Sequence, residues 1–285
     1  MIKKRVIATI IIKDGWAVQS IGFNNYLPVG KAEIAAEFFN EWGVDEIALI
    51  DISATRNNTL IQSETVKKVA SKIFTPLSVG GGIKTIDDIR LILDHGADKV
   101  IINHALKKSD FIQKAIHYFG KQCIIASVDA IQEGKKYYRY DYLTHNFTDD
   151  LFQTLQSIQT GEILLNSVNR DGMKNGYDLE LYTKALEVTQ TPLIAMGGAK
   201  NPYNLRELFD KTDLSAAAAA NFFHYYEHSI SITKALLKSD TNRPIRHDGL
   251  LKYNQFEFDE DGRIKKQDEE ELQQMLFEHH QREII

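Results

Sequence analysis

With 285 residues, 43% of them hydrophobic and 26% charged, the chain has the size and composition of one large globular domain followed by a tail. A net charge of −5 without a basic stripe disfavours nucleic-acid binding, and no apolar stretch reaches the roughly 18 residues that a membrane span needs. Cys123 is the single cysteine and has no disulfide partner within the chain, which favours a reducing, cytoplasmic location.

The first predicted element is a strand and not a signal sequence. The basic segment Met1–Arg5 precedes the apolar run Val6–Ile12, as in a secretory leader. The run then meets Lys13-Asp14-Gly15 without a small-residue cleavage site, so we interpret it as a strand and a turn.

Further along the chain, short β-branched runs alternate with longer segments of helical period, which is the pattern of βα units around a parallel sheet. The expected strands are Arg5–Ile12, Glu46–Ile52, Leu77–Val79, Lys99–Asn103, Cys123–Asp129, Glu162–Ser167, Leu193–Met196 and Ser215–Ala220. The expected helices are Lys31–Trp42, Leu60–Ile73, Ile86–His95, Asp110–Phe119, Asp149–Ser157, Asp178–Val188, Tyr203–Phe209 and Glu227–Leu237. This alternation predicts an α/β fold, a closed (β/α)8 TIM barrel over residues 1–238, in preference to an open doubly wound sheet.

The barrel sequence also repeats itself. Pro76–Ile83 recurs as Pro192–Ala199, an offset of 192 − 76 = 116, and Glu46 recurs as Glu162 at the same offset, 162 − 46 = 116. We interpret this as a two-fold repeat of half-barrels. The alternative is that any series of βα units brings glycine after a strand.

Residues 239–285 form a predicted C-terminal α+β extension of unknown role. We expect a linker at Ser239–Arg246, a strand at Phe256–Phe258, a hairpin turn at Asp261-Gly262 and a charged helix at Asp268–His280. The extension either packs on the barrel or docks a partner.

Glycine-rich turns follow the third and seventh predicted strands, as Gly80-Gly81-Gly82 and Gly197-Gly198. Such turns let backbone N–H groups approach phosphate oxygens, so the pair predicts a small molecule with a phosphate at each end. Asn103 and Asn221 end the fourth and eighth strands and are candidate donors, although either could be a simple turn former. The candidate phosphate-binding residues are Gly81, Gly82, Asn103, Asp171, Gly172, Gly197, Gly198 and Asn221.

Three carboxylates follow apolar runs, where the mouth of a barrel would lie. They are Asp51, Asp129 and Asp171. We favour Asp129 as a catalytic acid or base, and we expect Asp171 with Gly172 to shape the second phosphate turn. A cap or turn role is the alternative for each aspartate.

Four charged residues stand at the starts of predicted strands, at the opposite end of the barrel. They are Arg5, Glu46, Lys99 and Glu162. If they converge on the barrel axis they would form a ring of ion pairs able to act as a gate. The alternative is that they are solvated strand starts.

Over Lys4 to about Leu237 the sequence resembles HisF, the cyclase subunit of imidazole glycerol phosphate synthase. The resemblance is carried by Lys4-Arg5-Val6-Ile7-Ala8, Lys13-Asp14-Gly15, Asp45-Glu46 with Asp51-Ile52, Val79-Gly80-Gly81-Gly82-Ile83, Gly96-Ala97-Asp98-Lys99-Val100, Gly161-Glu162-Ile163-Leu164-Leu165, Asp171-Gly172 with Gly176-Tyr177-Asp178, and Gly197-Gly198-Ala199. The resemblance implies that ammonia from a HisH-like glutaminase enters the barrel floor through an ammonia gate. The gate residues would be Arg5, Glu46, Lys99 and Glu162, and Asp98 would meet the glutaminase.

The mouth of the barrel departs from this family. The family's cyclase uses two aspartates; the second matches Asp129, but the first position holds Ile11. Gln19 replaces a loop lysine, His104 a small hydroxyl residue and Asn221 a small residue of the second phosphate site. Isoleucine cannot transfer a proton, so cyclase activity is expected to be impaired.

An intact floor beneath an altered mouth is similar to the HisF-like proteins of surface-polysaccharide gene clusters. Those proteins are associated with acetamidino groups of O-antigen sugars, together with a HisH-like glutaminase and an ATP-dependent sugar amidotransferase. The alternatives are a working cyclase (a lyase) of histidine biosynthesis and a non-enzymatic scaffold. The sequence indicates neither a cofactor nor a metal site.

Overall fold

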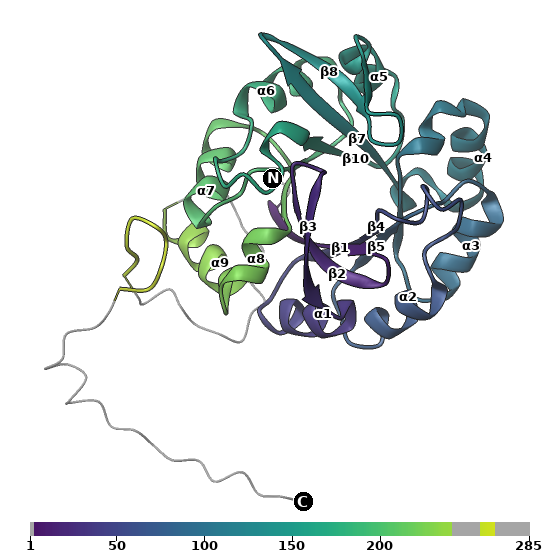
Figure 1. Cartoon of the computed structure of the whole chain (residues 1–285). Coiled ribbons are helices and arrows are strands. Elements are labelled where there is room, and N and C mark those ends of the chain that lie inside the picture. Colours follow the sequence, from purple (N-terminus) through teal and green to yellow (C-terminus); the bar gives the residue numbers. More distant parts are fainter. Residues whose placement is uncertain (1–2, 241–256, 266–285) are drawn as a thin grey trace, which may run out of the picture.

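The computed structural model describes residues 3–240 and 257–265, in which eight parallel strands close into a barrel ringed by helices (Figure 1). The barrel strands, in order around the ring, are β1 (Arg5–Lys13), β4 (Glu46–Asp51), β5 (Leu77–Gly80), β6 (Lys99–Ile102), β7 (Ile124–Glu133), β10 (Glu162–Ser167), β11 (Leu193–Met196) and β12 (Ala216–Ala219). The ring closes because β1 pairs with both β4 and β12, and β10 pairs with both β7 and β11. The (β/α)8 prediction is confirmed.

Helices follow the strands and form the outer layer. They are α1 (Ala32–Glu41), α2 (Ser63–Ala70), α3 (Ile86–Asp94), α4 (Ser109–Phe119), α5 (Leu151–Ser157), α6 (Leu179–Val188), α7 (Pro202–Lys211), α8 (Asn221–Tyr225) and α9 (Ser229–Asp240), with short 3-10 turns at His104–Lys107, Lys121–Cys123 and Val168–Arg170. Most predicted bounds agree within three residues. The short helix α8 was not predicted. The helix predicted at Tyr203–Phe209 is α7, which begins at Pro202; proline is favoured at the first position of a helix.

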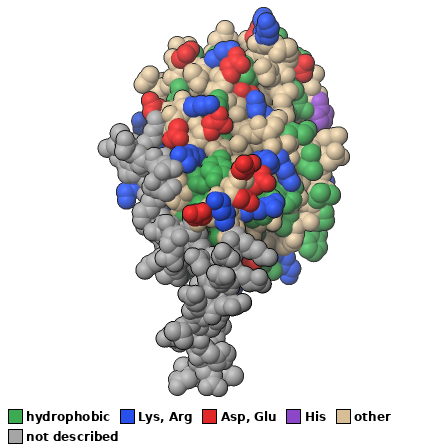
Figure 2. Space-filling view, turned by 90° about the vertical axis from the view of Figure 1, so that its left-hand side faces the viewer, with side chains coloured by type: hydrophobic (Ala, Val, Ile, Leu, Met, Phe, Trp, Pro, Cys, Tyr) green, Lys and Arg blue, Asp and Glu red, His purple; other side chains and the backbone are tan. Residues whose placement is uncertain are grey.

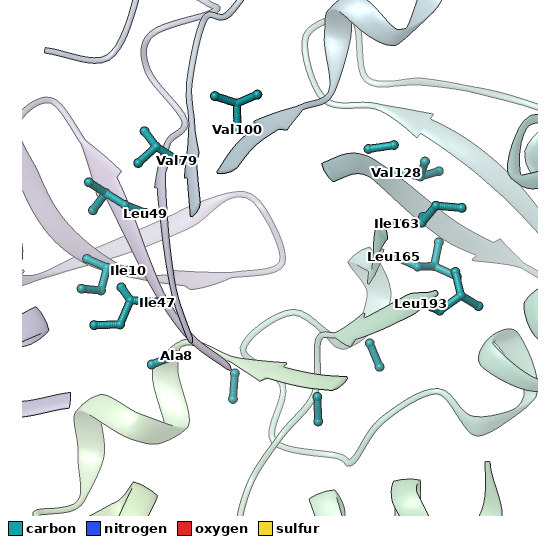
Figure 3. Close-up of a cluster of buried hydrophobic side chains, with 14 of the residues drawn as sticks. Ala8, Ile10, Ile47, Leu49, Val79, Val100, Val128, Ile163, Leu165 and Leu193 are labelled. Atoms are coloured by element: carbon teal, nitrogen blue, oxygen red, sulfur yellow. The ribbon is translucent and has the colours of Figure 1, made fainter. Parts of the chain in front are cut away.

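Period-two alternation divides the strand side chains between two apolar layers. Outward-facing residues such as Ile10, Leu49 and Ile163 pack with the helices in the larger cluster (Figure 3). Inward-facing residues such as Ile7 and Ile101 form a second, smaller cluster along the barrel axis. Both faces of the barrel strands are therefore covered, which explains the continuous apolar runs in the sequence.

Inside the barrel, the same alternation stacks chemically different layers along the axis. On β10, Glu162, Leu164 and Asn166 point inward in turn. The other inward series are Arg5, Ile7, Thr9 and Ile11 on β1; Glu46, Ala48 and Ile50 on β4; Lys99 and Ile101, then Asn103, on β6; and Ile125, Ser127 and Asp129 on β7. The axis thus runs from a charged floor through an apolar middle to a polar mouth.

Two hairpins at the mouth were missed in the sequence. The strands β2 (Trp16–Ile21) and β3 (Asn25–Gly30) extend β1, while β8 (Lys136–Asp141) and β9 (Asn146–Thr148) extend β7. Each hairpin follows the first strand of one predicted half-barrel, and the repeated segments fall on equivalent strands, β4 with β10 and β5 with β11. The two-fold repeat therefore includes the hairpins.

The described part of the C-terminal extension, residues 257–265, lies beside α7 (Figure 1). Phe258 bridges to Ile264 around the predicted turn at Gly262, and the Tyr203 hydroxyl donates to the Asp259 carbonyl at 2.9 Å. This segment packs on the barrel. The linker prediction is wrong at its start, because α9 continues to Asp240; residues 241–246, Phe256 and the helix predicted at 268–280 lie outside the described residues.

None of the helices in the described residues combines the length and apolarity needed to cross a membrane. On the face of the molecule seen in Figure 2, acidic and basic side chains are interspersed.

Candidate functional site

The upper end of the barrel contains a cavity of about 610 Å³, lined by strand C-termini and by both hairpins. This is the end at which (β/α)8 enzymes carry their active sites. The predicted site residues that line it are Gly81, Gly82, Asn103, Asp129 and Asp171. Gly172, Gly197, Gly198 and Asn221 are not part of the lining.

Asp129 lines the cavity from β7 and is almost completely buried. Its carboxylate accepts hydrogen bonds from Asn103 Nδ2 at 2.8 Å and Asn166 Nδ2 at 3.5 Å. Burial raises the pKa of Asp129 to about 6, although the two amide donors oppose the shift. A carboxyl group with this pKa can exchange protons near neutral pH, as a general acid or base must.

Asn166 was not singled out in the sequence, yet it is the neighbour of Asp129 in register across β7 and β10. Its Oδ1 is buried and has no hydrogen-bond partner among the described residues. An unsatisfied acceptor beside a cavity is a position where a ligand hydroxyl or N–H group would be stabilised.

Ile11 occupies the cavity wall and is 5% exposed, packed with Val18 and Met196 in the axial apolar cluster. No titratable group replaces it at this point of β1. Asp51, the nearest predicted alternative, caps its own turn by accepting from Ser53 N at 2.8 Å and Ala54 N at 3.1 Å. Burial raises the pKa of Asp51, although these two hydrogen bonds oppose the shift.

The first glycine turn opens onto the cavity. Gly82 has φ +73°, and a side chain there would collide with the Thr59 carbonyl, so only glycine fits. Gly82 N–H donates to Thr55 Oγ1 at 3.2 Å. Asn103, predicted as a phosphate donor here, instead directs its amide to Asp129.

Asn221, Asp171 and Gly172, three residues of the second predicted phosphate site, are covered by the β2–β3 hairpin. Asn221 uses both halves of its side-chain amide on the backbone of Ser20 in β2, at 2.7 and 3.1 Å. Asp171 accepts from Ser20 Oγ at 2.6 Å and Phe23 N at 3.2 Å, and burial raises its pKa. Gly172 lies directly beneath Ser20. The β2–β3 hairpin therefore occupies the space above the second predicted phosphate site.

Aromatic side chains from the two hairpins meet at the mouth. Phe23 and Tyr140 have ring centroids 6.3 Å apart, and Tyr140 OH lies 2.8 Å from His145 Nδ1. Tyr26 and Tyr142 also line the cavity. These residues could be found from sequence only once the hairpins were recognised.

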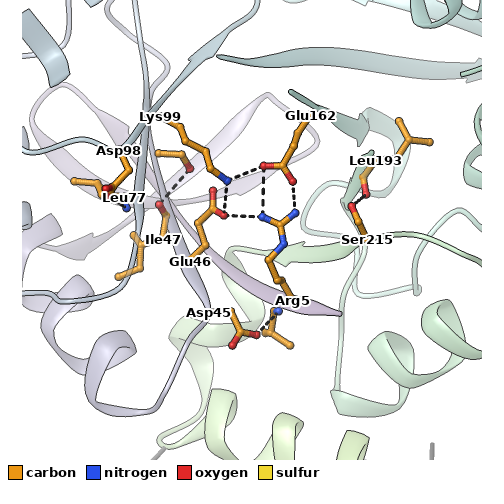
Figure 4. Close-up of polar contacts among 12 residues, drawn as sticks. Arg5, Asp45, Glu46, Ile47, Leu77, Asp98, Lys99, Glu162, Leu193 and Ser215 are labelled. Atoms are coloured by element: carbon orange, nitrogen blue, oxygen red, sulfur yellow. Dashed lines mark hydrogen bonds and ion pairs between the residues drawn. The ribbon is translucent and has the colours of Figure 1, made fainter. Parts of the chain in front are cut away.

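At the floor, the four predicted gate residues converge on the barrel axis and form a closed ring (Figure 4). The Arg5 guanidinium bonds to Glu162 and lies 2.9 Å from Glu46 Oε2, while Lys99 Nζ lies 3.0 Å from Glu46 Oε2 and 2.7 Å from Glu162 Oε2. Each cation contacts both carboxylates. The alternative of four separate solvated strand starts is therefore not what the structure contains.

The ring is partly shielded from water, and its members hold one another charged. Burial opposes the charge of Arg5 and Lys99, but Glu46 and Glu162 outweigh it and raise the pKa of both cations. Burial likewise disfavours the Glu162 carboxylate, yet its bonds to Arg5 and Lys99 lower its pKa. Glu46 Oε1 remains buried with no hydrogen-bond partner among the residues that the structure describes.

Asp98 lies beside the ring on the same end of the barrel and is exposed. One carboxylate oxygen accepts from Leu77 N at 2.8 Å, which fixes the side chain against β5 (Figure 4).

Within the described residues, no three His, Cys, Asp or Glu side chains are grouped to hold a metal ion.

Comparison of the sequence with known proteins shows the family to which this barrel belongs. The model of a family described as "Histidine biosynthesis protein" matches residues 5–229. The chain is similar to a "Putative imidazole glycerol phosphate synthase subunit hisF2" of Vibrio vulnificus, at 41% identity over 92% of this chain and 98% of that protein. It is also similar to imidazole glycerol phosphate synthase subunits HisF from two Staphylococcus aureus strains, at 38% and 37% identity over 84% of this chain and 97% of each relative. The chain therefore belongs to the histidine biosynthesis protein family, among the HisF-type imidazole glycerol phosphate synthase subunits.

Proposed function

We propose that this protein is the acceptor-side subunit of a glutamine-dependent amidotransferase, which receives ammonia from a HisH-like glutaminase at its floor. The observation that carries the proposal is the ring of Arg5, Glu46, Lys99 and Glu162 across the barrel axis. Two carboxylates and two cations, each contacting both opposite charges, close the floor without leaving a net charge. A small neutral molecule passes once a single ion pair opens.

The layer above the ring supports ammonia and not ammonium as the transferred species. The axial cluster consists of buried apolar side chains, including Ile7, Ile101 and Leu164. An ion that enters such a layer loses its hydration, which costs several kcal/mol of free energy. A neutral amine avoids this cost. The floor ring and the apolar layer together lead to the cavity that contains Asp129.

The glutaminase is proposed to dock at the end of the barrel that carries Asp98. This carboxylate is exposed and held in place from behind by Leu77 N–H, so its other oxygen remains available to a partner. We place the protein in the cytoplasm, in keeping with the free Cys123.

For the use of the ammonia, we propose amidination of a sugar in surface-polysaccharide (O-antigen) biosynthesis, catalysed by an ATP-dependent amidotransferase partner. Ile11 supports this choice, because the cavity wall opposite Asp129 is apolar where a cyclase needs a second acid–base group. If such a group contributes roughly 10²–10⁴-fold to the rate, its loss removes about 3–6 kcal/mol of transition-state stabilisation.

A second candidate function is the cyclase reaction of histidine biosynthesis, with lyase activity. It is favoured by the pKa of about 6 at Asp129, which suits a general acid or base. The names of the relatives also favour it.

The two functions are separated by supplying the purified chain with the aminoimidazole ribonucleotide precursor and an ammonium salt. The expected result is no imidazole glycerol phosphate above the uncatalysed level, and little gain from Ile11→Asp, because Gln19 and His104 also depart from the family pattern. A HisF subunit assayed in parallel is the control. Turnover by the unaltered chain comparable with that control would refute the amidination proposal.

A further inference from the structure

We propose that the upper cavity binds a ligand carrying a single phosphate group, held beside the Gly81-Gly82 turn, and excludes a second phosphate from the opposite side. The inference rests on the proposed function only in taking this cavity as the ligand site. It narrows the ligand class, since the repeated glycine turns of the sequence predict a compound with two phosphates.

Four lysine and arginine side chains line the cavity. Arg56, Lys84 and Lys108 stand in the loops after β4, β5 and β6, whereas Lys13 at the end of β1 is already paired with the adjacent aspartate. Lys84 Nζ donates to the uncharged Asn58 Oδ1 at 2.7 Å. Within residues 3–240 and 257–265, no carboxylate forms an ion pair with Arg56, Lys84 or Lys108, so their positive charge is available to an anion.

The opposite side offers acceptors instead. The lining residues from β10, β11 and their loops are Leu164, Asn166, Asp171 and Met196, none of which is cationic. The nearby Arg170 turns away, because its guanidinium donates to the carbonyls of Asn175 and Gly176 at 3.2 Å each. A second phosphate placed here would meet the Asp171 carboxylate without a compensating cation.

The β2–β3 hairpin also covers Gly172 and Asn221, two residues of the second predicted phosphate site. Five hydrogen bonds hold it: two between Asn221 and the Ser20 backbone, one from Ser20 Oγ and one from Phe23 N to the Asp171 carboxylate, and one from Gly22 N to the Asp171 carbonyl. Asn221 is 7% exposed, so its amide is shielded from solvent and from ligands. A phosphate can reach Gly172 and the Asn221 amide only if these bonds break.

The far end of the ligand is therefore expected to be uncharged and to donate hydrogen bonds. It would face the Asp129 carboxyl group and the unpartnered Asn166 Oδ1 at the cavity floor. Both groups accept from a hydroxyl or an amine and repel an anion. A phosphate monoester of a polyhydroxylated or amino compound satisfies both sides of the cavity.

The test is calorimetric titration of the isolated chain, at constant ionic strength, with fructose monophosphate and fructose bisphosphate. The expected result is saturable binding of both compounds, with affinities within about threefold of each other. Arg56→Ala should weaken the affinity for both compounds by about fivefold or more. The control is Lys174→Ala, which removes a cation stacked on Tyr225 and should change neither affinity by more than about twofold.

A second variant tests the hairpin itself. The variant combines Ser20→Ala with Asn221→Ala, and circular dichroism verifies that it folds. Its affinity for the bisphosphate should rise at least about fivefold relative to its affinity for the monophosphate. A bisphosphate preference above about tenfold in the unaltered chain, or no saturable binding of either compound, would overturn the proposal. These titrations need no glutaminase, so their failure leaves the ammonia-transfer proposal to be judged by its own assay.

Discussion

At the scale of single residues, the alternation along each barrel strand decides what a side chain can do. Glu162 and Asn166 both point inward on β10, four residues apart, and end in different layers of the axis. Ile163, between them, packs outward against the helices (Figure 3). Charge at a strand start therefore reaches the floor ring, and polarity at a strand end reaches the cavity.

The positions of the ring residues and of Asp129 could be predicted from sequence because each is a polar residue at the start or end of an apolar strand, and because the resemblance to HisF singled out the ring. The partners of Asn221 could not. It bonds to Ser20, which lies 201 positions away, and neither residue carries a local signal for that contact. Asn166 was overlooked because an asparagine at a strand end is indistinguishable from a turn former until its neighbours are known.

His224 gives a prediction at this scale. Its ring packs on Phe39 with centroids 5.0 Å apart, Nε2 has no partner among the described residues, and burial lowers the pKa of His224 to about 4. In the unfolded chain the same ring takes a proton near pH 6.5, so the free energy of unfolding should fall as the pH drops from about 6.5 to about 4. The loss should be about 2–3 kcal/mol.

The measurement is urea denaturation across that pH range for the unaltered chain and for His224→Leu. The difference between the two profiles isolates the histidine from the buried carboxylates, whose raised pKa values act in the opposite direction. Parallel profiles would show that His224 does not stay neutral in the folded state.

At the scale of elements, α9 is tied to the floor of the barrel by a buried ion pair. Lys234 Nζ on α9 lies 2.6 Å from Asp45 Oδ1 and donates to the Gly43 carbonyl at 2.6 Å. The other oxygen of Asp45 accepts from Val6 N at 2.7 Å, at the start of β1. One carboxylate thus joins α9 to β1, the strand that begins with Arg5 of the ring.

Lys234→Ala is expected to lower the free energy of unfolding by about 3–5 kcal/mol, because it breaks the buried ion pair with Asp45. The matched control is Lys184→Ala, which removes an exposed pair with Glu180 four residues away and should cost less than about 0.5 kcal/mol. Chemical denaturation of both variants gives the comparison. Equal losses would mean that the buried pair does not hold α9.

The sequence predicted the barrel strands well because they are short β-branched runs buried on both faces, such as Val6–Ile12. The hairpins were missed for the opposite reason. The segments Trp16–Ile21 and Lys136–Asp141 mix aromatic, charged and small residues, and only their pairing with β1 and β7 makes them strands. Their position decides the shape of the cavity, so the site could be located from sequence while its asymmetry could not.

At the scale of the whole molecule, the layers along the axis form one arrangement. The ring at the floor, the apolar cluster above it and the Asp129 cavity come from the same strands at successive inward positions. Two-fold repetition of half-barrels supplies the framework, with β4 and β10 each contributing a glutamate to the ring. The two halves of the mouth differ, because the β2–β3 hairpin bonds to Asn221 and Asp171 of the second half.

Ammonia passage through the ring is the central claim, and Lys99→Ala tests it in the reconstituted complex with the co-encoded glutaminase and amidotransferase. Removing Lys99 leaves Arg5 as the one cation against two glutamates, which changes the closed circuit of ion pairs. The control is Lys72→Ala, which removes an exposed ion pair with Glu37. The quantity measured is the number of glutamines hydrolysed per molecule of aminated product, beside the rate with an ammonium salt.

For Lys99→Ala we predict that this number rises severalfold while the ammonium-driven rate stays unchanged, and that Lys72→Ala leaves both as they are. A ratio in Lys99→Ala equal to that of the unaltered protein would contradict the assignment of the ring as the ammonia gate.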